Sequence, residues 1–165
     1  MIETGDKAPD VTLQLADGSS TPLGTMLGRT LVLYFYPKDD TSGCTREAQD
    51  FSALVDAFEE SGATILGISK DTPKAHGKFT EKYELKVALA TDADGSVCEA
   101  FGTWIEKSMY GRKYMGIDRA TFLIDKDGTI ARVWRKVKVP GHAEEVLAAA
   151  TALGAGGGAP AAATV

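Results

Sequence analysis

Residues 30–45 read TLVLYFYPKDDTSGCT, and this stretch decides how the fold is assigned. Its first seven residues form a continuous apolar run rich in residues that favour β-structure, which is typical of a strand covered on both faces. A polar loop over residues 37–43 follows, and Cys44 comes directly after it. From there apolar residues recur at three- and four-residue spacing, which predicts an amphipathic helix over about 44–58.

A second buried strand is predicted over Ala63–Ser69, where the sequence is again apolar and rich in β-formers. Strand, helix and strand with short connections make a βαβ unit, whose right-handed crossover leaves the two strands parallel. The loop 37–43 then lies at the carboxyl end of a strand, where open α/β sheets place their sites. Cys44 is therefore at a favoured position for chemistry.

The rest of the chain continues in the same α/β manner. Asp71 to Tyr83 is predicted to be helical, with Pro73 in the first turn, and residues 87–90 a short strand. A short helix after Gly95 holds Cys98. The remaining elements are two strands joined by a tight turn, 121–125 and 129–134, and a last helix over about 141–152. The predicted fold class is α/β, a central mixed β-sheet flanked by helices.

Composition favours one domain without disulfides or metal. The chain has 165 residues, of which 44% are hydrophobic and 25% charged, enough for one core over residues 1–153. Residues 154–165 are rich in Gly, Ala and Pro, which predicts a disordered tail. A net charge of -5 argues against nucleic-acid or anionic membrane partners. No secretory signal or membrane span is evident, so a cytoplasmic location is expected.

Cys44 is the candidate nucleophile. At the start of a helix, unpaired backbone N–H groups and the helix dipole favour a thiolate over a thiol; a buried cysteine acting as a small hydrophobe is the alternative. Thr41 is either a helix cap or a hydroxyl that accepts a hydrogen bond from a bound peroxide. Pro37 terminates the strand and can also shield the thiolate from water.

Pro37, Thr41 and Cys44 resemble the peroxiredoxin signature, in which proline, three residues, threonine, two residues and cysteine follow one another. The resemblance extends from about Asp6 to Leu153. It points to the bacterioferritin comigratory protein, or peroxiredoxin Q, branch, and is carried by four segments: Tyr36–Thr45, Gly67–Ser69, Val97–Gly102 and Gly116–Asp125.

The resemblance implies a thioredoxin fold, no cofactor and the reduction of hydrogen peroxide and small organic hydroperoxides. It also implies an arginine that meets the cysteine, which by position is Arg119; a guanidinium there can stabilise the thiolate and the departing oxygen. Glu47, one turn after Cys44, is expected to orient this arginine or to act as a first-turn dipole partner. A monomer is expected, reduced by thioredoxin, glutathione or glutaredoxin.

The sequence departs from the branch at the second, resolving cysteine. The two usual positions of that residue are Gln49 and Thr80 here. Cys98 matches a further family cysteine that is structural in many members, and its apolar neighbours suit a core-facing turn. Either Cys98 resolves after local unfolding of the first helix, or the enzyme works with one cysteine.

Three other classes of function have weaker support in the sequence. A thiol-disulfide oxidoreductase needs two cysteines one turn apart, and Cys44 has no such partner. A metal site is not expected, because Cys44, Cys98, His76 and His142 share no ligand spacing; the histidines are predicted to face solvent. A binding module is supported only by a basic run that is expected to decorate a sheet edge, Arg132, Arg135, Lys136 and Lys138.

Overall fold

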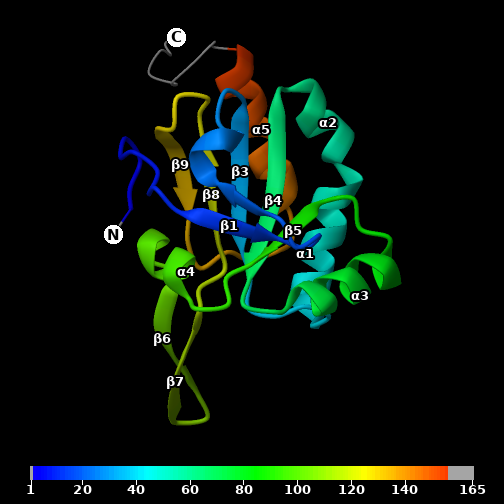
Figure 1. Cartoon of the computed structure of the whole chain (residues 1–165), viewed down its shortest axis with the longest axis vertical. Helices are drawn as coiled ribbons and strands as arrows, with labels where there is room; N and C mark the ends of the chain where they lie inside the picture. Colours follow the sequence, from blue (N-terminus) through cyan, green and yellow to red (C-terminus); the bar gives the residue numbers. More distant parts are fainter. Residues whose placement is uncertain (1, 156–165) are drawn as a thin grey trace.

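The computed structural model describes residues 2–155 and is built around a seven-stranded sheet (Figure 1). The strand order is β2-β1-β5-β4-β3-β8-β9. The strands are β1 Thr12–Leu15, β2 Ser20–Pro22, β3 Thr30–Phe35, β4 Ala63–Ser69, β5 Ala88–Thr91, β8 Ala120–Ile124 and β9 Ile130–Trp134.

The sheet is mixed, as predicted. β3, β4 and β5 are parallel neighbours, whereas β8 runs antiparallel to β3. β3 lies in the middle of the sheet and all six of its residues are buried, which explains its continuous apolar sequence. The loop that follows β3 therefore lies at the carboxyl ends of β3 and β4, next to the start of β8.

Two apolar cores cover the two faces of the sheet. One contains side chains from α1 (Ser42–Ala53), α2 (Val55–Glu60), α3 (Pro73–Tyr83) and α5 (His142–Ala155). The other lies on the opposite face and contains side chains from α4 (Ser96–Phe101), β1 and the 3₁₀ helix η1 (Leu23–Met26). Successive β3 residues alternate between the cores, Val32 and Tyr34 into the first, Leu33 and Phe35 into the second.

Several predicted boundaries need correction. The helix expected over 44–58 begins earlier, at Ser42, and is interrupted at Leu54, whose ψ of 5° separates α1 from α2. The last helix extends to Ala155, so Gly154 and Ala155 are helical instead of part of a tail. The other residues predicted to be disordered, 156–165, lie outside the described residues.

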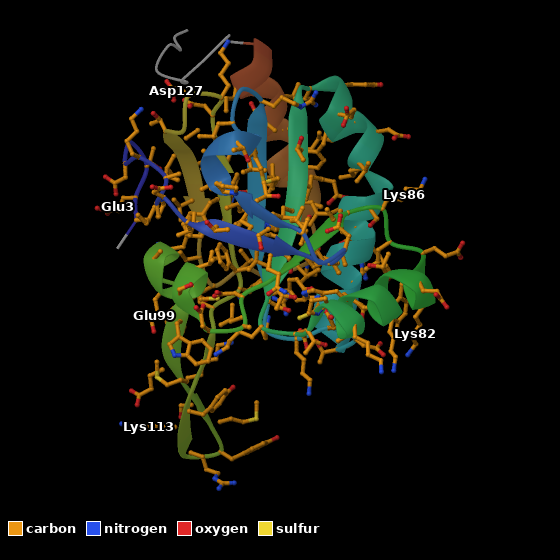
Figure 2. All side chains as sticks on the ribbon, in the orientation of Figure 1. Glu3, Lys82, Lys86, Glu99, Lys113 and Asp127 are labelled. Carbon is orange, nitrogen blue, oxygen red and sulfur yellow. The ribbon has the colours of Figure 1, made fainter. Side chains whose placement is uncertain are left out.

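Four short strands were not predicted. β1 and β2 pair around Asp17-Gly18, and a separate hairpin consists of β6 (Trp104–Met109) and β7 (Arg112–Ile117). Figure 1 shows that this hairpin projects from the body of the molecule, and Lys113, labelled in Figure 2, lies on its outer part. None of the helices within residues 2–155 is long and apolar enough to cross a membrane.

Both histidines are buried, so the prediction that they face solvent is wrong. His76 on α3 has no exposed surface, and His142 at the start of α5 is 6% exposed. The reason is that each finds polar partners inside: His142 Nε2 lies 2.8 Å from Thr121 Oγ1, and His76 contacts a carboxylate and a carbonyl oxygen. A buried polar ring is tolerated when its nitrogens are paired in this way.

Candidate active site

Cys44 is the third residue of α1 and is 1% exposed. Thr41 occupies the N-cap position in extended conformation without a side-chain capping bond. The backbone N–H groups of the first helical turn have no partner within the helix. The sulfur therefore lies near the positive end of the helix dipole. Cys44 thus lies at the start of a helix, as predicted from the sequence, but its side chain is buried.

Arg119 lies in the short link between β7 and β8, next to Ala120. Ala120 pairs with Phe35, the last residue of β3, so the antiparallel register brings residue 119 beside the loop that leads to Cys44. The guanidinium donates from Nη2 to Cys44 Sγ at 3.4 Å and from Nη1 to Glu47 Oε1 at 2.7 Å. The structure thus brings Arg119 into contact with Glu47 and Cys44, which lie 72 and 75 residues earlier in the chain.

Glu47 is held deep beneath this arginine. It is 1% exposed, and its second oxygen, Oε2, has no hydrogen-bond partner. Burial raises the pKa of Glu47 to about 7, although the guanidinium of Arg119 acts in the opposite direction. Keeping Glu47 ionised in this buried place is therefore costly and depends on the charge of Arg119. The Glu47 carboxylate in turn fixes the plane of the Arg119 guanidinium.

Gly43 leaves room for the guanidinium. A Cβ atom at this position would lie 3.1 Å from Arg119 Nη2, closer than about nine in ten real contacts of this kind. Because glycine has no side chain, the arginine can approach the backbone just before Cys44. A larger residue at position 43 would force the guanidinium to shift by a few tenths of an ångström.

Thr41 and Pro37 are exposed residues of the same loop. Thr41 Oγ1 donates to the carbonyl of Lys38 at 2.8 Å and makes no capping bond with the helix. Its proton is thus engaged while its lone pairs stay available to accept a hydrogen bond. Pro37 directly follows the Tyr36 end of the central strand, and its shielding role stays a prediction.

The structure does not bring Cys98 to this site. Cys98 has no exposed surface and belongs to the core on the face of the sheet opposite to Cys44. Burial, with the nearby carboxylate of Asp92, raises the pKa of its thiol to about 12. The carboxylate of Asp92 also accepts the backbone N–H groups of Val97 and Cys98 and so fixes the start of α4. Both cysteines are free thiols.

Sequence reasoning missed how the loop is tied to α3. Asp40, with a φ of 58°, accepts hydrogen bonds from Lys82 and Tyr83, at 2.9 and 2.6 Å; Lys82 is labelled in Figure 2. Asp39 is turned inward toward His76. The two adjacent aspartates were a visible signal, but their partners lie about forty residues away in the chain.

The remaining predicted residues have structural roles. Phe51 and Tyr36 are buried in the core, and the two tryptophans are half-buried against the cores, as expected. In the basic run on and after the edge strand β9, Arg132 pairs with Glu145, and Arg135 donates to backbone carbonyls of residues 2, 101 and 102.

Comparisons with known proteins agree with this geometry. The model of the AhpC/TSA family matches residues 4–133. A putative peroxiredoxin Bcp from Coxiella burnetii is 49% identical over 146 residues, which are 88% of this chain and 97% of that protein. The peroxiredoxin Bcp of Bacillus subtilis is 48% identical, and the match covers 88% of this chain and 93% of the relative.

A solved structure of the bacterioferritin comigratory protein from Xanthomonas campestris is also similar. It has a TM-score of 0.83 and 46% identity, and the match covers 87% of this chain and 92% of that one. The likeness confirms the thioredoxin-like fold and the branch predicted from the sequence. The chain therefore belongs to the AhpC/TSA family and is, like these relatives, a peroxiredoxin of the Bcp branch, a peroxidase that works through a thiol.

Proposed function

We propose that Cys44 is the peroxidatic nucleophile of this peroxidase, assisted by Thr41, Arg119 and Pro37, with Glu47 supporting the arginine. The single observation that carries the assignment is the guanidinium that bridges Cys44 Sγ and Glu47 Oε1. A permanent positive charge at the sulfur stabilises the thiolate before the reaction and the leaving oxygen during it.

The reaction then needs no cofactor. The Cys44 thiolate attacks the terminal oxygen of the hydroperoxide, a sulfur–oxygen bond forms and the O–O bond breaks. The products are a sulfenic acid on Cys44 and an alkoxide or hydroxide, which takes a proton from solvent to become an alcohol or water. Thr41 Oγ1 accepts a hydrogen bond from the hydroperoxide O–H, and this contact holds the O–O bond in line with the sulfur.

Hydrogen peroxide and small alkyl hydroperoxides are the proposed substrates. The X. campestris relative, whose structure is 46% identical, is described by its alkyl peroxide reduction activity. We extend that substrate class to this chain on the strength of this likeness.

An external thiol, thioredoxin or another small or protein thiol, is the proposed reductant. Cys98 lies across the sheet from Cys44 and its thiol pKa of about 12 leaves it protonated, so it is a poor resolving nucleophile. We therefore favour a one-cysteine cycle. It would proceed in a cytoplasmic monomer with one domain.

Intact mass after one equivalent of hydrogen peroxide tests this cycle, with and without a sulfenic-acid trap. We expect a trapped adduct on Cys44 both in the wild type and in Cys98→Ser, because Cys98 is not needed. A loss of two hydrogens in the wild type that is absent from Cys98→Ser would make Cys98 the resolver. No oxidation at Cys44 in either protein would refute the peroxidase role of this residue.

Glu47→Gln should slow the reaction in a pH-dependent way. A hydrogen bond to a charged group contributes about 1.5–3 kcal/mol, so losing the carboxylate that orients Arg119 should lower the rate of Cys44 oxidation by about 10- to 100-fold at pH 8. Below a Glu47 pKa of about 7 the wild type itself becomes protonated at this site and loses the same interaction. The ratio of the two rates should therefore shrink as the pH falls.

Stopped-flow measurement of Cys44 oxidation at pH 6, 7 and 8 checks this expectation, with Glu59→Gln as the control. Glu59 is an exposed surface residue of α2 that pairs with Arg29 at 3.5 Å, so its variant should match the wild type at each pH. A ratio of wild type to Glu47→Gln that stays constant from pH 6 to pH 8 would contradict the proposed titration of Glu47.

A further inference from the structure

A buried polar cluster lies directly behind the Cys44 loop and takes no part in the steps described above. Its centre is His76 on α3, which has no exposed surface. The ring nitrogen Nδ1 lies 2.7 Å from Asp39 Oδ2, and Nε2 lies 2.9 Å from the carbonyl oxygen of Ala90 on β5. Both distances are those of hydrogen bonds, so both ring nitrogens are engaged.

The partners decide the charge of this ring. A carbonyl oxygen can only accept, so Nε2 carries a proton. Asp39 Oδ1 accepts from the hydroxyl of Tyr36 at 2.5 Å, a length typical of a bond to an ionised carboxylate. Burial raises the pKa of Tyr36 well above its ordinary value, so Tyr36 keeps its proton and donates it. An ionised Asp39 can only accept, so in that state Nδ1 would also carry a proton and the ring would be an imidazolium.

Asp39 transmits this ion pair to the active-site loop. It is 8% exposed and lies two residues before Thr41 and five before Cys44. Its backbone N–H donates to Asp71 Oδ2 at 2.9 Å, and Ser69 Oγ donates to the same oxygen at 2.6 Å. The loop is therefore held from inside by Asp71, in the link between β4 and α3, and by His76 on α3.

Removal of the positive ring would leave the Asp39 carboxylate unpaired in a dry place. Such a charge is costly, so the carboxyl group would take up a proton or move outward to water. Either change would release the loop that carries Thr41. A displacement of about 1 Å in a reacting geometry can cost on the order of a hundredfold in rate.

We propose that His76 is a positioning residue: a buried imidazolium that, through Asp39, holds Thr41 and Cys44 in the conformation that reacts with peroxide. The proposal rests on the function assigned to Cys44 above. It gives α3, which contributes no reacting atom, a direct part in the rate of the reaction.

The first test reads the charge of His76 without any assay of activity. The chain has only two histidines, so the ¹⁵N NMR spectrum of the ring nitrogens can be assigned by comparison with His142→Gln. At pH 7 we expect His76 to show two protonated nitrogens. His142, whose pKa burial lowers to about 4, should show one. A single protonated nitrogen on His76 would overturn the proposal.

The second test compares two rates at Cys44 in His76→Gln, where the side chain keeps its polarity but not the charge. Oxidation by hydrogen peroxide should slow by about tenfold to a hundredfold, while alkylation by iodoacetamide should stay equal or become faster, because the loop opens. Equal oxidation rates in wild type and variant would overturn the proposal. So would a parallel fall of both rates, since that pattern means an effect on the thiol's charge.

Two further variants keep the test interpretable. His142→Gln removes the other buried histidine, which is not in contact with Asp39, and should leave both rates within about twofold even if stability falls. Asp39→Asn should reproduce the slow oxidation, and the double variant Asp39→Asn, His76→Gln should be no slower than the worse single variant. If the rate losses of the two single variants multiplied in the double variant, the two residues would act independently. That result would overturn the proposal that His76 acts through Asp39. If Cys44 of the wild type were not oxidised, the proposed function would be refuted instead. The NMR experiment would still report the charge of His76, because it does not depend on activity.

Discussion

Cys44→Ser should abolish hydroperoxide consumption, with a loss of at least about 10⁴-fold in the rate of the first step. The serine hydroxyl has nearly the same size as the thiol and fits the same buried place, which is 1% exposed in the wild type. It stays protonated, however, and neither the helix dipole nor Arg119 can turn it into an anion at neutral pH. Loss of the nucleophile, and not of the fold, is the expected cause.

The measurement is the disappearance of hydrogen peroxide with a thiol reductant in excess, beside thermal unfolding of both proteins. Cys98→Ser is the matched control, because it removes the other buried thiol from the opposite face of the sheet. We expect Cys98→Ser to keep most of the activity. Unchanged consumption by Cys44→Ser would disprove the mechanism proposed here.

The central part of this fold could be predicted because its signals are local. The apolar run of β3 and the three- and four-residue spacing of α1 specify a βαβ unit, and the loop between them contains the reactive cysteine. The parallel pairing of β3 with β4 confirms that part of the prediction. The interruption at Leu54 was not visible, because Leu54 and Val55 continue the apolar spacing across the break.

The β6–β7 hairpin shows why other elements were missed. Its strands are joined by Tyr110 and Gly111, with φ values of 53° and 78°. A two-residue turn with positive φ at both positions is the ordinary hairpin turn, but its usual sequence signal is Asn-Gly or Asp-Gly. Tyrosine hides that signal, and the largely exposed strands on both sides have no clear apolar face.

His76 shows the limit of reading a helix in isolation. The neighbours Lys74 and Lys78 are exposed, and a histidine between them is expected to be exposed as well. Phe79, three residues later on the same helix face, is buried and was the one local hint. The partner that makes burial of the ring tolerable is Asp39, 37 residues earlier in the chain. Only the folded chain brings the two together.

Arg119 was placed by family resemblance, and the structure adds the reason for its position. The antiparallel pairing of β8 with β3 puts Ala120 opposite Phe35, so the preceding residue is fixed at the end of the central strand. Sheet register thus determines which arginine meets the thiol.

Arg119→Met should lower the rate of Cys44 oxidation by about 10²–10³-fold, the usual cost of removing a group that stabilises developing negative charge. Methionine fills part of the same space but cannot donate to Cys44 Sγ or to Glu47 Oε1, which lie 3.4 and 2.7 Å from the guanidinium nitrogens. The variant also leaves the Glu47 carboxylate buried without its partner, which should raise the pKa of Glu47 further. Stopped-flow oxidation with hydrogen peroxide measures the loss.

Arg119→Lys separates charge from geometry. Lysine keeps the positive charge but presents it as a single point and cannot donate in parallel to sulfur and carboxylate, so an intermediate loss of about tenfold is expected. Arg132→Met is the control: it breaks an exposed pair with Glu145 on the sheet edge and should leave the rate within about twofold. If Arg119→Lys were as slow as Arg119→Met, the fixed fork of donors would be the essential property; if Arg119→Met were as fast as the wild type, the guanidinium would have no part in the reaction.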